Sequence, residues 1–228
     1  MTHCRTVAWD LVVFDNDGVL VDSERLANGV LAGLLSELWR PTTLQECIDA
    51  YLGGSIERVR AIVEAESGRP LPADFEDRYH HELFAAFERG LSPVAGVEAV
   101  IDRLEESGTS FCVASSGSHQ RVERALRHAG LWDRFAGRVF SADDVARGKP
   151  APDLFLHAAS RMGAVPEATV VIEDSPLGVE AARSAGMAVI GFAAVTPRER
   201  LGAASVVVET MQDVGAELAA MWIGRSRG

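Results

Sequence analysis

The sequence predicts an α/β protein in which a parallel sheet carries a small, separate group of helices. Three observations support this fold class. From residue 93 onward, strand and helix signals alternate along the chain. Residues 23–91 show only helix signals, whereas the apolar, β-branched run at 8–14 resembles the later strands. Alternating strands and helices are typical of a parallel sheet covered on both faces. The helical stretch is therefore predicted to be an insertion after the first strand.

The first strand is predicted at Ala8 to Phe14, where an apolar run ends in acidic residues and an Asp17-Gly18 turn. Apolar residues at helical spacing then predict four helices, separated by proline and glycine. They are expected at Glu24 to Trp39, Leu44 to Leu52, Ser55 to about Ser67, and Pro72 to Phe87. The predicted domains are therefore a core of residues 1–22 and 92–228 and a four-helix cap of residues 23–91. The stretches 22–23 and 91–93 are the expected hinges.

The rest of the chain supplies the other elements of the core. Helices are predicted at 95–107, 119–129, 152–162 and 175–185, with a last helix from Thr210 to about Trp222. Strands are predicted at 110–114, 139–140, 169–172, 188–192 and 206–208. The alternation of these strands with helices predicts a parallel sheet covered on both faces.

Composition excludes several classes of protein. The chain has 228 residues and a net charge of −11, which argues against nucleic acid or an anionic membrane surface as a partner. Its three cysteines are scattered, as expected in a reducing cytoplasm. No leader and no apolar run of about 20 residues is evident. The prediction is a cytoplasmic protein, either a monomer or a homodimer.

One lysine stands out among the basic residues. Lysine and arginine together number 22, and Lys149 is the only lysine. Arginine is a broad planar fork, whereas lysine is a compact point charge with three donors. The exception therefore predicts a site that needs a small ammonium group.

Polar residues follow the predicted strands where parallel sheets place their ligands. Asp15 and Asp17 follow the first strand, and Ser115 follows the second. Glu173 and Asp174 follow another, while Lys149 stands before a helix. Carboxylate and carbonyl oxygens without histidine or cysteine select Mg²⁺. The pattern predicts a site for an anion, best read as phosphate, bound through this cation.

The same residues suggest a division of labour. Ser115 and the backbone N–H groups from Ser116 onward precede a helix and are expected to bind phosphate together with Lys149. Asp15, held by the strand, is the candidate nucleophile, because aspartate can form an aspartyl-phosphate. Asp17 can protonate the leaving oxygen and later deprotonate the attacking water.

These residues resemble the haloacid dehalogenase superfamily of phosphohydrolases. The motifs are Asp15 to Ser23, Val113-Ala114-Ser115, Gly148 to Asp153 and Glu173 to Met187, and together they cover nearly the whole chain. The resemblance implies a Rossmann-like core, a four-helix cap after motif one, and an aspartyl-phosphate mechanism. It also implies Mg²⁺ on the Asp15 carboxylate, the Asp17 carbonyl and Asp174, with Glu173 nearby or acting through water.

The branch of the superfamily is narrowed by single residues. Asp17 argues against dehalogenation, which needs no leaving-group proton, and a cap without lysine excludes the Schiff-base chemistry of phosphonate-cleaving relatives. A β-phosphoglucomutase-like phosphomutase remains the alternative, although Ala27, Gly53 and Glu57 stand where that branch carries histidine, lysine and arginine. A non-catalytic binding protein is less favoured, because no catalytic group is missing. The expected function is a phosphatase of a small phosphorylated metabolite, such as a sugar phosphate. Specificity is expected from Gly54, Ser55, Arg58 and His119.

Overall fold

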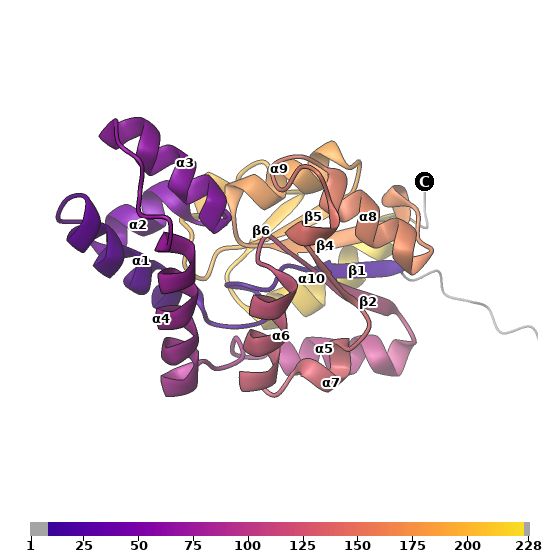
Figure 1. Ribbon diagram of the computed structural model, residues 1–228. Helices are drawn as coiled ribbons and strands as arrows, with labels where there is room; N and C mark the ends of the chain where they lie inside the picture. The colour runs from indigo at the N-terminus through magenta and orange to yellow at the C-terminus, as the bar shows by residue number, and fades with distance from the viewer. Residues whose placement is uncertain (1–8, 226–228) are drawn as a thin grey trace, which may run out of the picture.

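The computed structural model describes residues 9–225 and contains one six-stranded sheet. All strand pairs are parallel, in the order β3-β2-β1-β4-β5-β6 (Figure 1). The strands are β1 Leu11–Phe14, β2 Ser110–Ser115, β3 Val139–Ser141, β4 Thr169–Glu173, β5 Ala188–Phe192 and β6 Val206–Val208. The predicted strand start at Ala8, like Cys4, lies outside the described residues. The predicted α/β fold with a Rossmann-like parallel sheet is confirmed.

The strand order gives β1 its special position. Strand β1 pairs with β2 on one side and with β4 on the other. The chain adds β2 and β3 on the first side of β1 and then crosses over to add β4, β5 and β6 on the second side. Such a topological switch point leaves a crevice at the carboxyl ends of the strands. All four β1 side chains are fully buried, because the sheet is covered on both faces. The residues that follow β1 therefore enter this crevice from a rigid support.

Successive β1 residues face opposite sides of the sheet, and each side has its own core. Val12 and Phe14 share a cluster with helices α5, α6, α7 and α10, whereas Leu11 and Val13 pack with α8 and α9. These helices are α5 Val97–Ser107, α6 His119–His128, α7 Trp132–Phe135, α8 Asp153–Met162, α9 Pro176–Ser184 and α10 Met211–Arg225. The two-residue alternation of a strand thus produces the three layers of the fold.

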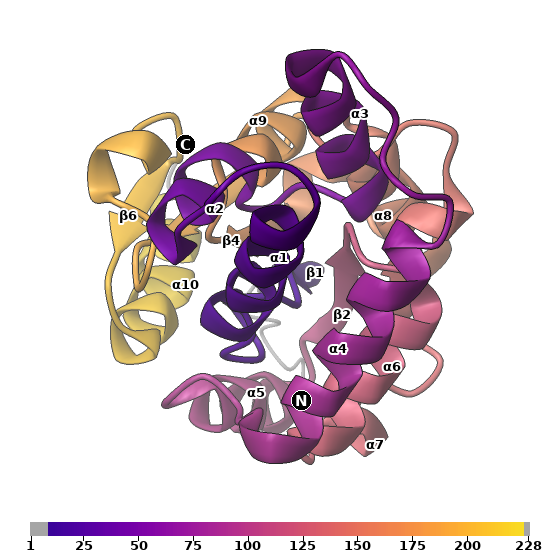
Figure 2. The ribbon, with the colours of Figure 1, turned by 60° about the vertical axis from the view of Figure 1, so that its left-hand side comes forward.

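Four helices separate β1 from α5, as the sequence predicts. They are α1 Glu24–Leu38, α2 Leu44–Tyr51, α3 Ile56–Ser67 and α4 Phe75–Gly90. Thr43 forms a capping box with Glu46 at the start of α2, and the Ser55 hydroxyl caps α3. Figures 1 and 2 show the four helices grouped at one side of the sheet, with α4 beside α6.

Several boundaries differ from those predicted. Helix α4 begins at Phe75, because residues 72–74 form a turn before it. The short helix α7 and the 3-10 turns at Ala142–Asp144, Pro166–Ala168 and Arg198–Leu201 were not predicted, because they are too short to show a period. Strands β2 and β4 extend one residue further, so Ser115 and Glu173 are themselves strand residues. Their side chains are therefore held by the sheet rather than by loops.

The described part of the chain gives two further facts. The thiols of Cys47 and Cys112 are free and buried. None of the helices within residues 9–225 combines the length and the hydropathy of a membrane-crossing segment.

Candidate active site

Asp15 leaves the end of β1 and turns into the crevice. Its backbone N–H donates to the Ile172 carbonyl at 3.0 Å, which continues the pairing with β4. The turn that follows contains Gly18 with a φ of 76°, and a Cβ there would lie 2.1 Å from Asp174 Oδ2. Only glycine accommodates both this φ and this close approach. The Asp-Gly turn thus brings the end of β1 against the end of β4.

Lys149 lies directly behind Asp15. Its Nζ donates to Asp15 Oδ1 at 2.7 Å, to Glu173 Oε1 at 2.6 Å and to the Ala114 carbonyl at 3.1 Å. The side chain is only 1% exposed. Three acceptors around one buried nitrogen match the three donors of an ammonium and leave no room for a planar guanidinium. The sequence prediction of a site that needs a small cation is consistent with this geometry.

Asp15, Glu173 and Asp174 form a buried cluster of carboxylates. Each offers an oxygen, and these three oxygens lie within 4.8 Å of one another. Both oxygens of Asp174 are buried without a hydrogen-bond partner. Burial, together with the nearby Glu24, Glu173 and Asp15 carboxylates, raises the pKa of Asp174 well above its usual value. Lys149 pairs with Asp15 and Glu173 but not with Asp174, so one ammonium faces three carboxylates. The cluster therefore has room for further positive charge, as a site for a divalent cation requires.

Glu173 has a more fixed position than the other two acids. Its Oε1 accepts from Lys149, while its Oε2 accepts from the Ser175 N–H and hydroxyl, each at 2.9 Å. Both oxygens therefore already hold donors. Glu173 positions the Lys149 ammonium between itself and Asp15.

Asp17 has different partners from Asp15. Its Oδ1 accepts from the Ser23 hydroxyl and from an Nη of Arg121, the latter at 2.7 Å. Burial alone would raise the pKa of Asp17, but the Arg121 charge and these hydrogen bonds outweigh it and lower the pKa. For Asp15, burial dominates the opposing effect of Lys149 and raises the pKa to about 7. Two carboxyl groups two residues apart thus have pKa values shifted in opposite directions.

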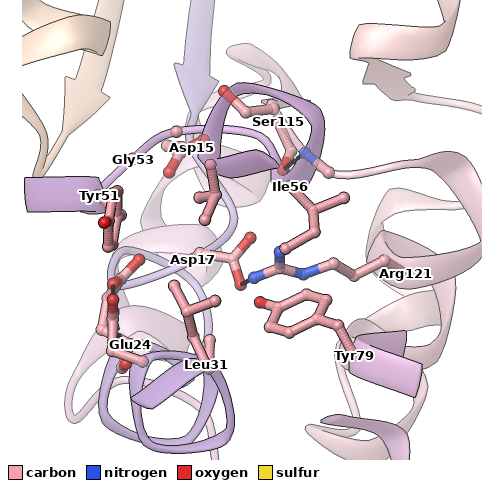
Figure 3. Close-up of a pocket in the computed structure, with 16 residues that line it drawn as sticks. Asp15, Asp17, Glu24, Leu31, Tyr51, Gly53, Ile56, Tyr79, Ser115 and Arg121 are labelled. Atoms are coloured by element: carbon pink, nitrogen blue, oxygen red, sulfur yellow. Dashed lines mark hydrogen bonds and ion pairs between the residues drawn. The ribbon is translucent and has the colours of Figure 1, made fainter. Parts of the chain in front are cut away.

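A pocket of about 40 Å³ opens above these acids (Figure 3). Ser115 and Ser116 line it, and the Ser115 hydroxyl accepts from the Gly117 N–H at 3.1 Å. Among the residues expected to set specificity, Gly54 lines the pocket. Its complete lining is Asp15, Asp17, Glu24, Ala27, Asn28, Leu31, Tyr51, Gly53, Gly54, Ile56, Val59, Tyr79, Ser115, Ser116, Gly117 and Arg121.

The other three expected specificity residues do not line this pocket. The Ser55 hydroxyl accepts from the Arg58 N–H at 3.4 Å as the cap of α3. Arg58 itself is exposed. His119 is also largely exposed, and its Nε2 lies 3.0 Å from Asp144 Oδ1. These three residues therefore lie outside the pocket above Asp15, and their role in specificity stays a prediction.

Sequence reasoning missed the two charged groups that complete the pocket, Glu24 and Arg121. Glu24 accepts from Asn28 Nδ2 at 2.8 Å and is buried. That burial, with a smaller contribution from Asp17, raises the pKa of Glu24 to about 8 despite the Arg121 charge. Glu24 directly follows the first motif, Asp15 to Ser23, and this adjacency is a sequence signal that it lies close to the two aspartates. Arg121 is one of many arginines on helices and carries no pattern that sets it apart.

The loop before α3 contacts the floor of the site through Gly53. Its φ is 74°, and a Cβ there would lie 2.5 Å from the Ser175 hydroxyl oxygen. We expect Gly53→Ala to lower turnover at least about 10-fold, because the loop must move away from the acids. Gly68→Ala is the matched control, since Gly68 has a φ of 68° in open space. Both variants should melt at a lower temperature than the wild type, because both place alanine at a positive φ. An equal loss of turnover in the two variants would contradict the proposed contact of the Gly53 loop with the site.

Comparisons with known proteins agree with this geometry. A family model described as haloacid dehalogenase-like hydrolase matches residues 9–186. A probable pseudouridine-5'-phosphatase of Drosophila melanogaster is 33% identical over 195 residues, covering 83% of this chain and 80% of that protein. Hexitol phosphatase A of Escherichia coli is 30% identical over 205 residues, covering 89% and 91%.

A solved structure also resembles this chain in both sequence and fold. A haloacid dehalogenase-like protein of unknown function from Agrobacterium tumefaciens superposes with a TM-score of 0.80 at 38% identity, covering 94% of this chain and 99% of that one. Sequence, fold and the arrangement of acids around β1 therefore lead to one conclusion. The chain belongs to the haloacid dehalogenase-like hydrolase family.

Proposed function

We propose that this protein is a Mg²⁺-dependent phosphatase that hydrolyses a small phosphorylated metabolite through an aspartyl-phosphate on Asp15. The observation that carries the proposal is the pairing of Asp15 with Lys149 beside the unpartnered Asp174 carboxylate. The phosphatase names of the relatives support the reaction class. Sugar phosphates and similar monoesters are the substrate class that we propose.

The acids at the sheet edge fit a magnesium ion. The unpartnered Asp174 oxygens require a cation, and the donor set is oxygen only. We propose that Asp15, Asp174 and the Asp17 backbone carbonyl would hold it, with Glu173 acting through water because its own oxygens already accept hydrogen bonds. When bound, Mg²⁺ supplies positive charge that offsets the charge of the phosphate and the carboxylates.

The reaction needs two carboxyl groups with separate tasks. An Asp15 oxygen attacks phosphorus as the bond from phosphorus to the leaving oxygen breaks, and Asp17 gives that oxygen a proton. Asp17 then takes a proton from water, whose oxygen attacks phosphorus, and the bond to Asp15 breaks. Inorganic phosphate leaves, and Asp15 returns as a carboxylate.

Ser115, Ser116 and Lys149 are proposed to hold the phosphoryl group. Ser115 offers a hydroxyl and lies in the pocket beside Asp15, while the chain from Ser116 onward leads into helix α6. Lys149 keeps the Asp15 carboxylate oriented and contributes charge from behind it.

We further propose that residues 23–91 form a cap domain on a core of residues 1–22 and 92–228. The pocket above Asp15 has a volume of about 40 Å³, enough for a few water molecules, and a movement of helices α1–α4 would open it for substrate. The two connecting stretches lie side by side, since the Asp22 N–H donates to the Ser92 carbonyl at 2.9 Å and Val21 pairs with Pro93. Adjacent connections suit a hinge.

The phosphomutase alternative is less well supported by the pocket lining. Ala27 and Gly53 line the pocket, so the positions compared with a histidine and a lysine carry no polar side chain. The assay product distinguishes the two reactions: free phosphate indicates a hydrolase, whereas a β-sugar 1-phosphate converted to the 6-phosphate indicates a mutase.

The substrate screen tests the proposed function as a whole. A panel of phosphate monoesters is incubated with the protein, with and without Mg²⁺, and free phosphate is measured. Release that depends on Mg²⁺ is expected for at least one sugar or polyol phosphate. If no member of the panel yields phosphate with any divalent cation, the proposal is wrong.

Magnesium is expected to stabilise the protein more at pH 8 than at pH 6. Asp15 and Glu24 have pKa values raised to about 7 and about 8, so the folded protein binds more protons than the unfolded chain above pH 4. Without metal, these groups stabilise the fold at low pH, and that contribution is lost as the pH rises through 7 and 8. The cation offsets the resulting charge. The shift in melting temperature on adding Mg²⁺ should therefore grow with pH, and a pH-independent shift would argue against this site.

A further inference from the structure

Arg121 is a buried cation in the pocket wall that holds Asp17 but takes no direct part in the proposed phosphoryl and proton transfers. It comes from helix α6, and its side chain is 10% exposed. Figure 3 shows its guanidinium directed toward Asp17, with the Tyr79 hydroxyl beside it. One Nη donates to Asp17, and the Tyr79 hydroxyl is a second hydrogen-bond partner of the guanidinium. The Nε atom is buried with no partner. Since a guanidinium has five N–H donors, this cation retains donor capacity within the pocket.

The pocket continues beyond Arg121. A second cavity of about 160 Å³ shares Ile56, Ser116, Gly117 and Arg121 with the first. Its remaining lining is Glu57, His80, Ser118, Ala142 and Asp143. Arg121 therefore stands where the two cavities meet. A substrate whose phosphate lies at Asp15 would extend its leaving group past this guanidinium.

The acids of the second cavity compensate the Arg121 charge only weakly. The two acids of the second cavity, Glu57 and Asp143, are exposed, and Asp143 already accepts from the His119 N–H at 3.0 Å. Exposed charges are screened by solvent and salt far more than a buried one. Arg121 is thus the buried charge of the second cavity.

The Asp17 carboxylate that pairs with Arg121 is also needed for the proposed reaction. Its carboxylate also has to face the leaving oxygen and then the attacking water, yet its Oδ1 is held by Arg121 and Ser23. A buried guanidinium whose carboxylate turns away is left uncompensated, which is costly. A second anion on the substrate would take over this pairing and free Asp17 for its task.

We infer that Arg121 is a specificity-determining residue that binds a second anionic group, a carboxylate or a second phosphate, in the leaving group of the substrate. The inference rests on the proposed phosphatase function, which places the reacting phosphate at Asp15. Arg121 suits this role, because a guanidinium binds carboxylate and phosphate through paired hydrogen bonds. Polyol phosphates of the same length, whose leaving group carries no charge, should be poorer substrates.

The test compares substrates that differ only in that second anion. One pair is 3-phosphoglycerate and glycerol 3-phosphate, and the other is 6-phosphogluconate and sorbitol 6-phosphate. In each pair a carboxylate replaces a hydroxymethyl group. For the wild type, kcat/KM should favour the carboxylate member of at least one pair by about 10-fold or more. Arg121→Gln should reduce that ratio by roughly 10- to 100-fold, the usual size of a hydrogen bond to a charged group.

Two further variants sharpen the comparison. Arg121→Lys keeps the charge and should retain part of the preference, since only the paired geometry is lost. Arg127→Gln is the matched control on the same helix, because Arg127 is exposed and pairs with Glu123. It should leave the ratio unchanged. Glycerol 3-phosphate and 3-phosphoglycerate are also titrated by calorimetry against Asp15→Asn with Mg²⁺, which measures binding without turnover.

Three results would overturn the inference. The first is equal kcat/KM of the wild type for both members of both pairs. This measurement does not depend on whether a variant folds. The second is an equal loss for all four substrates in Arg121→Gln, which would assign Arg121 to the reacting phosphate or to Asp17 alone. The third is equal affinity for the two ligands in calorimetry. Hydrolysis of p-nitrophenyl phosphate separates the two proposals: release of phosphate without a carboxylate preference refutes only the Arg121 inference, whereas no release from any ester refutes the phosphatase.

Discussion

Replacing Asp15 by asparagine is expected to reduce phosphate release by at least about 10³-fold, because an amide cannot form the acyl phosphate. The shape of the side chain is kept, and Lys149 retains Glu173 as a buried carboxylate partner. We therefore expect a folded variant with a melting temperature within a few degrees of the wild type. Initial rates with a Mg²⁺-dependent substrate and a thermal melt measure both quantities.

The control for this variant is Asp10→Asn. Asp10 is exposed and immediately precedes β1, so the same chemical change is made at the other end of the same strand. Turnover should be unchanged there. If Asp15→Asn keeps wild-type turnover, another residue is the nucleophile.

Replacing Lys149 by methionine is expected to damage both stability and turnover. The ammonium is 1% exposed and is the cation between Asp15 and Glu173. Removing one partner of a buried ion pair costs about 3–5 kcal/mol, because the other charges are left unpaired. Lys149→Arg should not restore turnover, since three acceptors within 3.1 Å enclose a single nitrogen. Urea unfolding and initial rates measure the two effects.

Arg147→Met provides the comparison for Lys149. Arg147 is two residues away, its side chain is 71% exposed, and it pairs with Asp153 on the surface. Surface ion pairs contribute about 0–1 kcal/mol, so little change is expected. A loss of stability in Lys149→Met no larger than in Arg147→Met would mean that the buried acids are not held by this lysine.

The sequence was sufficient to predict most of the fold, because its strands and helices have strong periods. The run at Leu11–Phe14 is apolar on both faces, as a central parallel strand must be. The parallel sheet in turn predicted that Asp15, Ser115 and Asp174 would converge, since each follows or ends a strand. Short elements such as α7 could not be predicted, because four residues are too few for a helical period.

The groups that the sequence did not reveal share a physical cause. Tyr79 lines the pocket beside Arg121, and α4, which carries Tyr79, packs beside α6, which carries Arg121, although the two helices are far apart in the chain. No local pattern encodes such a contact. The contact of the His119 ring with Asp144, 25 residues further along the chain, likewise follows from tertiary packing and not from a local pattern. Partner choice on a helix surface depends on tertiary packing, which periodicity does not report.

The central claim is a covalent phosphoryl group on Asp15, and chemical trapping tests it most directly. The protein is mixed with substrate and Mg²⁺, quenched during turnover and treated with borohydride, which reduces an acyl phosphate to an alcohol. Peptide mass spectrometry then locates the modified residue. We predict conversion of Asp15 to homoserine only when substrate is present, and none in Asp15→Asn. Rapid turnover with an unmodified Asp15, or modification at another carboxylate, would contradict the account.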